Sequence, residues 1–182
     1  MSAGPHRLPG DPSAAETIAR MIRVDHAGEY GAARIYHGQL AVLGRSPATD
    51  SIRAMAEQEK RHLAAFDRLV VERRVRPTAL SPLWHVAGFA LGAASALLGE
   101  RAAMACTVAV EEVIDEHYRA QSEALGDSES ALKATIDEFR HHEIEHRDTA
   151  LAHGAEAAPG YAVLSAAIKA GSRLAIWLST RI

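Results

Sequence analysis

The sequence predicts an all-α fold, and three observations lead to that prediction. Alanine, leucine and glutamate, which are strong helix formers, dominate the 182 residues. Long runs of β-branched and aromatic residues, which favour strands, are missing. Apolar residues recur at helical spacing along four long segments. Because 48% of the residues are hydrophobic and no break in composition divides the chain, we expect one domain over residues 13–182.

The charge balance and the cysteine count exclude several classes of protein. The net charge is −3 and no long block of like charge occurs, so a nucleic-acid partner is not indicated. The single cysteine, Cys106, allows no intramolecular disulfide and fits a reducing compartment. Residues 1–12 lack the apolar core of a signal peptide and the repeated arginines of a mitochondrial leader. We expect a short disordered N-terminus and a bacterial protein.

The first two helices are predicted over residues 13–43 and 48–75. Ser13 and Glu16 have the spacing of a capping box, in which each side chain binds the other residue's amide. Pro77 lies just beyond the second segment, and the residue before a proline avoids the helical conformation. These signals give each helix a defined end.

The third predicted helix, residues 83–98, carries no formal charge. Ser81 and Pro82 before it resemble an N-cap followed by proline at the first helical position. The segment is shorter than the ~20 residues that span a bilayer, so a buried, interfacial or re-entrant helix is expected. Three further helices are predicted over residues 100–125, 128–153 and 159–182.

The last helix has an apolar stripe that allows two interpretations. The stripe contains Ala162, Val163, Ala166, Ala167, Ala170, Leu174 and Trp177, while Lys169, Arg173 and Arg181 lie elsewhere. The stripe could pack on the other helices. Alternatively the helix lies on a membrane surface, with its tryptophan and arginines at the level of the lipid headgroups.

Charged residues interrupt the apolar stripes of the second and fifth helices at matching places. In the second helix the stripe passes through Glu59 and His62, and in the fifth it passes through Glu143 and His146. Residues three apart on a helix project side by side, so each Glu-x-x-His pair can grip one ion. A buried unpaired carboxylate is costly, so these groups need a cation as partner.

The first and fourth helices each add one carboxylate on a comparable stripe. Glu29 shares a stripe with Ile22 and Tyr36, and Glu111 shares one with Met104 and Tyr118. The chain therefore repeats one pattern, a helix with a glutamate followed by a helix with Glu-x-x-His. Ferritin-like four-helix bundles hold two iron or manganese ions with this ligand set. Four carboxylates and only two imidazoles suit iron or manganese better than zinc.

Other acidic and basic residues compete with the six predicted ligands. Glu138 and His141 also form Glu-x-x-His, but they fall off the apolar stripe and should face water. Glu112 neighbours Glu111, which we prefer because it shares the face of Tyr118. Candidates for contacts behind the ligands are Asp25, His117, Tyr118 and Asp148, of which Asp25 and Asp148 could accept the outer N–H of a ligating histidine.

Five stretches resemble the demethoxyubiquinone hydroxylases of ubiquinone biosynthesis. They are Arg-Val-Asp-His-Ala-Gly-Glu-Tyr-Gly-Ala (23–32), Gln-Glu-Lys-Arg-His (58–62), Arg-Val-Arg-Pro-Thr (74–78), Ala-Cys-Thr-Val-Ala-Val-Glu-Glu (105–112) and Glu-Ile-Glu-His (143–146). The resemblance covers about residues 18–182. It implies a ferritin-like four-helix bundle with two extra apolar, membrane-interacting helices. It also implies two iron ions held by Glu29, Glu59, His62, Glu111, Glu143 and His146, the set reached from the stripes.

The resemblance also implies an activity and its partners. The family hydroxylates the ring of a 3-demethoxyubiquinol with O2, which requires a polyprenyl quinol substrate and electrons from NADH or quinol. No Gly-x-Gly-x-x-Gly fingerprint supports a Rossmann-type nucleotide site. The apolar helices imply peripheral attachment to the cytoplasmic side of a bacterial cell membrane. A lipid-binding partner protein and a homo-oligomer are further implications.

Proteins of other classes share parts of this pattern. A ferritin-like iron oxidase or storage protein has the same ligands but does not need an apolar helix in mid-chain. A di-iron peroxidase of the rubrerythrin type would be expected to carry a cysteine-rich segment, which this chain lacks. A helical bundle without metal would leave the buried charges unexplained.

Overall fold

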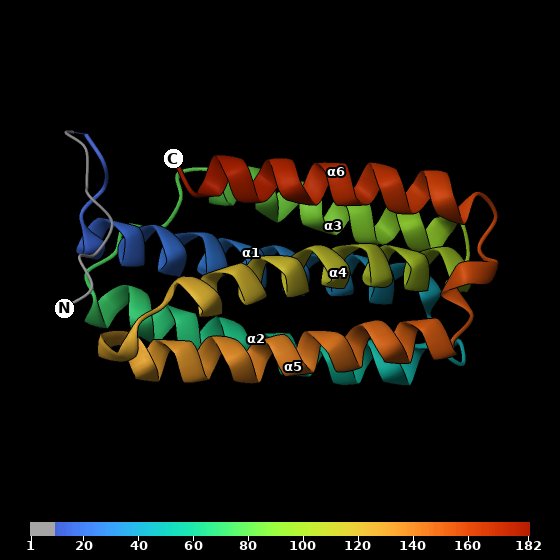
Figure 1. The fold of residues 1–182 in the computed structure, drawn as a ribbon. Coiled ribbons are helices and arrows are strands. Elements are labelled where there is room, and N and C mark those ends of the chain that lie inside the picture. Colours follow the sequence, from blue (N-terminus) through green and yellow to red (C-terminus); the bar gives the residue numbers. More distant parts are fainter. Residues whose placement is uncertain (1–9) are drawn as a thin grey trace.

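The computed structural model describes residues 10–182, and the regular structure in that range is entirely helical (Figure 1). Its elements are α1 (Ala14–Leu43), α2 (Thr49–Glu72), α3 (Ser81–Leu97), α4 (Glu100–Ala124), η1 (Asp127–Glu129), α5 (Ser130–Ala152), η2 (Ala155–Ala157) and α6 (Tyr161–Ser179). The all-α prediction is confirmed for these residues. The disorder predicted for residues 1–12 falls, for residues 1–9, outside the described range.

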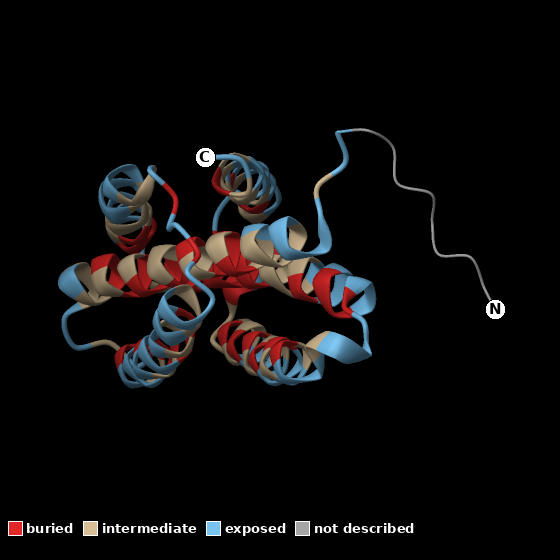
Figure 2. Cartoon of the chain, turned by 90° about the vertical axis from the view of Figure 1, so that its left-hand side faces the viewer, coloured by how far each residue is buried: buried red, intermediate tan, exposed pale blue. Residues whose placement is uncertain are grey.

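The six α-helices form three layers of two helices each. Helices α3 and α6 form one outer layer, α1 and α4 the middle layer, and α2 and α5 the other outer layer (Figures 1 and 2). Contacts between layers run from α1 to α2 and α3, and from α4 to α5 and α6. The four helices predicted to carry the charged groups thus make a bundle, and α3 and α6 cover one side of it.

Two apolar clusters fill the bundle at opposite ends. One contains Ile22, Phe66, Tyr118 and Ile136. The other contains Tyr36, Ile52, Met104 and Ala150. Figure 2 shows that buried residues concentrate in the middle layer and on the faces turned toward it. Glu59 and His62 lie along α2 between residues of the two clusters, so the chain surrounds its charged groups with apolar side chains.

The capping box predicted for the first helix is confirmed. The amide of Glu16 donates to Ser13 Oγ at 3.2 Å, and the amide of Ser13 donates to a carboxylate oxygen of Glu16 at 2.6 Å. Helix α1 therefore begins at Ala14, where the sequence signal indicated.

Two other boundaries differ from the prediction. Helix α2 ends at Glu72, before the predicted residue 75, because Arg74 adopts a left-handed conformation with φ of 53°. The predicted N-cap role of Ser81 is wrong, since Leu80 is the N-cap and Ser81 is the first residue of α3. The Ser81 hydroxyl donates to the carbonyl of Thr78 at 2.9 Å and caps no amide of the helix.

Helix α6 turns its predicted apolar stripe outward. Val163, Leu174 and Trp177 are 77%, 57% and 52% exposed. The face turned to the bundle includes Ile168 and Leu164 instead. The interpretation that the stripe packs on the bundle is therefore wrong, because the face of α6 that carries Leu164 and Ile168 takes that position. Along residues 10–182, no helix is long and apolar enough to cross a membrane.

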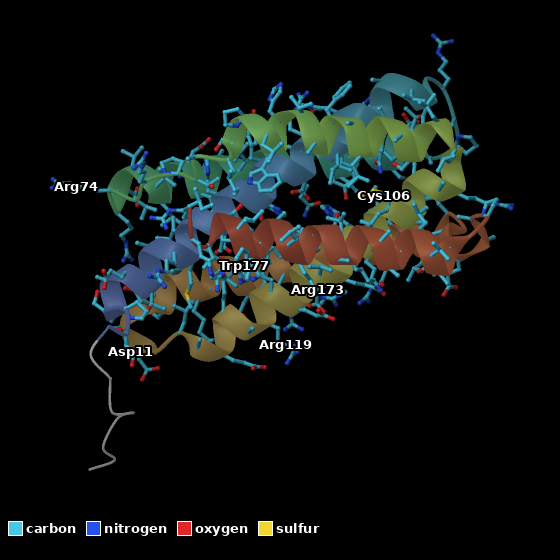
Figure 3. The ribbon with its side chains drawn as sticks, turned by 90° about the horizontal axis from the view of Figure 1, so that it is seen from above. Asp11, Arg74, Cys106, Arg119, Arg173 and Trp177 are labelled. Carbon is cyan, nitrogen blue, oxygen red and sulfur yellow. The ribbon has the colours of Figure 1, made fainter. Side chains whose placement is uncertain are left out.

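Helix α3 adds to the same outer surface. Leu83, Val86 and Leu97 are 52%, 65% and 76% exposed. We call the exposed apolar side chains of α3, of its C-cap residue and of α6 the outer apolar face; it comprises Leu83, Val86, Leu97, Leu98, Val163, Leu174 and Trp177. Figure 3 looks onto this layer. Isolated exposed apolar residues are common on proteins, but a layer of two helices that presents them together indicates an interaction surface.

Glycines allow α3 to approach α1 closely. A Cβ at Gly92 would lie 1.9 Å from the carbonyl oxygen of Ile35, and one at Gly38 would lie 2.2 Å from that of Phe89. Gly88 likewise faces the backbone of α1. Gly88 and Gly92 thus serve a close contact between two helices of the same chain.

Candidate metal centre

All six predicted ligands meet between the middle layer and the layer of α2 and α5. Helix α1 contributes Glu29 and helix α4 contributes Glu111, while α2 and α5 contribute one Glu-x-x-His pair each. None of the six is more than 3% exposed: Glu29, Glu59, His62, Glu111, Glu143 and His146. The stripes therefore predicted correctly which side chains the fold brings together.

His62 lies among three carboxylates at one end of the cluster. Its Nδ1 is 3.1 Å from Glu143 Oε1, 3.3 Å from Glu29 Oε2 and 3.8 Å from Glu59 Oε2. The nitrogen that would bind a metal thus points inward, toward the oxygens that would bind the same ion.

His146 occupies the equivalent place at the other end. Its Nδ1 is 3.1 Å from Glu59 Oε1 and 3.2 Å from Glu143 Oε2. Glu59 and Glu143 therefore turn one oxygen to each histidine. Both glutamates are thus placed to contribute an oxygen to each end of the cluster.

Two overlapping groups of ligand atoms result from this geometry. One group is Glu29, Glu59, His62 and Glu143, and the other is Glu59, Glu111, Glu143 and His146. In each group the four ligand atoms lie within 4.8 Å of one another. The fold therefore brings together two overlapping groups of possible metal ligands, and Glu59 and Glu143 belong to both.

The hydrogen bonding of these groups supports a metal as their partner. Among the described residues, several buried atoms of the cluster have no hydrogen-bond partner: Glu29 Oε2, both oxygens of Glu59, His62 Nδ1, Glu111 Oε2 and Glu143 Oε1. Buried polar atoms are almost always paired. Because all of these atoms point into one region and can donate electron pairs, the residues present fit a pair of cations.

The pKa values show how strongly the carboxylates and histidines interact. Burial, followed by the charges of Glu143 and Glu29, raises the pKa of Glu59 well above its usual range. Burial would also raise the pKa of Glu143, but the adjacent imidazoles of His146 and His62 lower it to about 2. Burial opposes protonation of His62, yet Glu143 and Glu29 raise its pKa to about 9. Without a metal, protons thus compensate part of the negative charge.

Two tyrosines bind the carboxylates that are not shared. Tyr36 of α1 donates to Glu111 Oε1 of α4 at 2.7 Å. Tyr118 of α4 donates to Glu29 Oε1 of α1. Each tyrosine fixes one oxygen of its glutamate and leaves the other, Oε2, facing the cluster. Tyr118 is therefore more than a packing residue of the core, and Tyr36 has a role that its stripe position alone did not indicate.

The predicted contacts behind the histidines are wrong for both aspartates. Asp25 accepts from Gln121 Nε2 at 2.8 Å and lies 3.1 Å from His117 Nε2, so it contacts no ligand histidine. Asp148 is exposed and pairs with Arg147. An aspartate one turn from a ligand can point along the helix toward other partners, as Asp25 does.

Two residues that the sequence did not single out contact the ligating histidines. His142 Nδ1 lies 3.0 Å from His62 Nε2, and Gln58 Oε1 lies 3.3 Å from His146 Nε2. Each directly precedes a ligand glutamate in the sequence, and this position is the signal that could have identified them.

The competing residues lie where the apolar stripes placed them. Glu138 and His141 are exposed, as predicted. Glu112 is half-buried and pairs with Lys169 of α6, whereas Glu111 is buried in the cluster. The preference for Glu111 is therefore consistent with the geometry.

An apolar cavity of about 330 Å³ lies on the opposite side of the middle layer. All four helices of the middle layer and the α3–α6 layer line it, and its residues include Gly28, Val110, Trp84, Ile176 and Ala175. Gly28 and Val110 directly precede Glu29 and Glu111. The cavity and the cluster are thus separated only by the thickness of α1 and α4.

Comparison with known proteins places this geometry in a family. Residues 16–179 match the family profile described as "Ubiquinone biosynthesis protein COQ7". The chain is 64% identical to a 3-demethoxyubiquinol 3-hydroxylase of Rhodospirillum rubrum over 97% of this chain and 84% of the relative. It is 56% identical to the mitochondrial NADPH-dependent 3-demethoxyubiquinone 3-hydroxylase of Homo sapiens over 91% of this chain and 78% of the relative.

A more distant relative covers the same helices. The mitochondrial 5-demethoxyubiquinone hydroxylase of Saccharomyces cerevisiae is 43% identical over 91% of this chain and 78% of the relative. Helices α1 to α6 fall almost entirely within the matched residues 16–179, so the match covers the cluster, the cavity and the outer apolar face. The chain therefore belongs to the demethoxyubiquinone hydroxylase family, the COQ7 family of ubiquinone biosynthesis proteins.

Proposed function

We propose that this protein is a membrane-associated di-iron monooxygenase with a ferritin-like bundle. Its reaction is hydroxylation of the ring of a 3-demethoxyubiquinol, a 2-polyprenyl-3-methyl-6-methoxy-1,4-benzoquinol, in ubiquinone biosynthesis. The observation that carries the proposal is the cluster of six buried ligands with unpartnered inner atoms. The names of the relatives supply the reaction, since each is a demethoxyubiquinol or demethoxyubiquinone hydroxylase.

Iron is the metal that best fits the ligand set and the reaction. Four carboxylates and two imidazoles are hard and intermediate ligands, which suit iron or manganese. When bound, a di-iron centre would activate O2, so that one oxygen atom enters the ring and the other leaves as water with two electrons and two protons from the donor. Glu29 and His62 would hold one ion and Glu111 and His146 the other, and Glu59 and Glu143, which belong to both groups of ligand atoms, would contribute to both.

The other residues of the site orient the ligands and exclude water. Tyr36 and Tyr118 fix the outer oxygens of Glu111 and Glu29. The apolar clusters above and below the site keep it dry, which strengthens every electrostatic interaction in it. The hydroxyls of Tyr36 and Tyr118 also stabilise the ionised form of these carboxylates, because each donates a hydrogen bond to one carboxylate oxygen.

The cavity is the proposed site of the quinol ring. Its walls are almost entirely apolar, it has the size of a small-molecule site, and its floor is formed by α1 and α4 beside the metal ligands. Its other walls belong to α3 and α6, whose outer apolar face would contact the membrane in which the polyprenyl tail resides. The substrate would thus pass from lipid to the site without crossing water. We propose that this occurs at the cytoplasmic side of a bacterial cell membrane.

Electrons and protein partners complete the proposal. NADH or quinol is the proposed donor, and the NADPH in the names of eukaryotic relatives makes a reduced nicotinamide nucleotide the first donor to test. A lipid-binding partner protein and a second copy of the chain are the proposed protein partners. Either could dock on the outer apolar face beside the membrane.

Genetic complementation tests the function. In a bacterial host that lacks its own hydroxylase, the wild-type chain should restore ubiquinone, measured by chromatography of lipid extracts. Glu143→Ala should leave the demethoxy precursor to accumulate, because this glutamate belongs to both groups of ligand atoms. Restoration by Glu143→Ala would remove the di-iron mechanism.

Glu138→Ala is the matched control, since Glu138 is an exposed glutamate on the same helix. It should restore ubiquinone as the wild type does. Solvent extraction of the purified protein separates the alternatives, because a co-purifying isoprenoid quinone supports the hydroxylase, whereas bulk mineral iron supports a storage protein.

A further inference from the structure

The outer nitrogens of the two ligating histidines meet the opposite helix in a reciprocal way. His62 of α2 reaches His142 of α5, with Nε2 and Nδ1 3.0 Å apart. His146 of α5 reaches Gln58 of α2, with Nε2 and Oε1 3.3 Å apart. In both cases the contacted residue is the one directly before the glutamate of a Glu-x-x-His pair. The two halves of the site thus use the same position for the same contact.

The chemistry of imidazole gives these contacts a direction. The inner Nδ1 atoms of His62 and His146 face the carboxylates, so they are the atoms that would bind metal. A neutral imidazole that binds metal through one nitrogen carries its proton on the other. Nε2 of each histidine is therefore a donor, and His142 Nδ1 and Gln58 Oε1 are its acceptors. An acceptor at this place fixes the tautomer and the ring orientation and makes the inner nitrogen a better ligand.

We propose that His142 and Gln58 are positioning residues, one for each metal ion, and this inference rests on the proposed di-iron function. His142 would orient His62 and so raise the affinity for the ion that Glu29 also binds. Gln58 would orient His146 and so raise the affinity for the ion that Glu111 also binds.

The surroundings of His62 fit this role for His142. The rings of the two histidines are nearly parallel, with an angle of 4° between their planes and centroids 5.2 Å apart. Phe139 stacks on His62 with centroids 4.1 Å apart, which restricts the ring without offering a hydrogen bond. His142 is thus the hydrogen-bond acceptor available to the outer nitrogen of His62.

The two acceptors differ in chemistry. An imidazole nitrogen is a stronger base than an amide oxygen, so His142 should polarise its histidine more than Gln58 does. The two ions would therefore be inequivalent although their direct ligands match one for one.

The test replaces His142 by phenylalanine, which keeps a ring and removes the acceptor. Binding of Co²⁺ to the metal-free protein is followed by visible absorption and by competition with a chelator. His142→Phe should lower the affinity for one of the two ions by about 10–100-fold and leave the affinity for the other unchanged. Glu29→Gln shows which absorption band belongs to the ion that Glu29 and His62 would bind, because Glu29 belongs to only one of the two groups of ligand atoms. His141→Phe is the matched control, because His141 is an exposed histidine beside His142.

The reciprocal variant and a rescue complete the experiment. Gln58→Leu should lower the affinity for the other ion, the one that Glu111 and His146 would bind. His142→Gln should restore most of the lost affinity, because an amide oxygen accepts from the histidine in the other half of the site. This rescue would not occur if His142 only filled space.

Each outcome bears on a defined claim. Wild-type affinity for both ions in His142→Phe would overturn the positioning role while leaving the di-iron function intact. Equal loss at both ions together with a lower melting temperature would also overturn it, since that result indicates general destabilisation. Failure of the wild-type protein to bind two ions would overturn the proposed function itself.

Discussion

Single ionisable groups in the centre determine how the metal-free protein responds to pH. Glu143 and Glu29 raise the pKa of His62 from 6.5 to about 9, so protonated His62 stabilises the fold. That contribution is fully present below pH 6.5 and is lost as the pH rises through about 9. The pKa of Glu59 is also raised by burial, so the folded protein binds a proton there that the unfolded chain releases. The stability that this proton contributes is likewise lost as the pH rises. Glu143, with a pKa of about 2, stays ionised throughout this range.

We therefore expect metal-free protein to lose up to about 3 kcal/mol of unfolding free energy as the pH is raised from 6.5 to about 9. Protein loaded with Mn²⁺ should lose little, because a metal-bound histidine has already given up its inner proton. Urea denaturation at several pH values, with chelator or with metal, measures both profiles. Equal slopes with and without metal would show that His62 does not compensate the buried carboxylates.

Tyr36 illustrates how a side chain outside the six ligands supports them. Tyr36→Phe removes the hydroxyl that donates to Glu111 Oε1 and leaves this buried oxygen without its donor. We expect the unfolding free energy of the metal-loaded protein to fall by about 1.5–3 kcal/mol, the range for a hydrogen bond to a charged group. Tyr30→Phe is the control, since Tyr30 is only half-buried and its hydroxyl contacts His85. Equal effects of the two variants in urea denaturation would contradict this role for Tyr36.

The six ligands could be located from the sequence because charged side chains on an apolar stripe are rare. Glu59 and Glu143 stand between buried apolar residues of one helix face, and the spacing alone reveals them. His142 and Gln58 could not be located in this way. Both are half-buried polar residues at the edge of that face. Their contacts depend on how α2 and α5 are rotated about their axes, which helical spacing does not specify.

At the scale of the elements, the contact of α1 with α3 depends on glycine. Gly92→Ala places a Cβ 1.9 Å from the carbonyl oxygen of Ile35, and a backbone atom cannot move aside as the end of a side chain can. We expect a loss of about 1–3 kcal/mol of unfolding free energy, the usual cost of overpacking. Differential scanning calorimetry of the two proteins measures the change.

Gly171→Ala provides the opposite control within another helix. A Cβ at Gly171 would meet no atom within 4 Å, so alanine should stabilise α6 through its higher helix propensity, by at most about 1 kcal/mol. A Gly92→Ala protein as stable as Gly171→Ala would show that α3 can move away from α1 without cost.

The sequence predicted the existence of the helices better than their ends. Apolar spacing and the Ser13 capping box were sufficient to predict where α1 begins. The end of α2 was missed because the chain turns at Arg74 and buries Val75 in the apolar cluster with Phe66, which helical spacing cannot distinguish from one more helical turn. The start of α3 was missed because the Ser81 hydroxyl binds a backbone carbonyl in the preceding turn.

At the scale of the whole molecule, the outer apolar face predicts binding to lipid. Burying one large apolar side chain contributes about 1.5–3 kcal/mol, which is about a 10–100-fold change in partitioning. Val163→Glu should therefore reduce binding to vesicles of anionic and zwitterionic phospholipid by at least about 10-fold, measured by co-flotation. Val71→Glu is the control, because Val71 is 76% exposed but lies on α2 in the layer farthest from α3 and α6. Equal binding of the two variants would contradict a membrane role for this face.

The layered arrangement itself was only partly predictable. Both faces of α6 are apolar or small, so the sequence does not indicate which face covers the bundle; Leu164 and Ile168 do so, and Val163 and Trp177 do not. The charged stripes of the bundle helices, in contrast, indicate one arrangement, in which the four charged faces meet in the interior and share bound protons or cations.

The position of the cavity has a kinetic consequence. It lies between the middle layer and α3 and α6, and with about 330 Å³ it accommodates a ring and the start of a tail but no long isoprenoid chain. Under the proposed function the rest of the tail stays dissolved in the bilayer while the ring reacts. Encounter is then a two-dimensional search by lateral diffusion, and added phospholipid dilutes the substrate. Turnover is governed by the mole fraction of quinol in the membrane and not by its amount per volume of water.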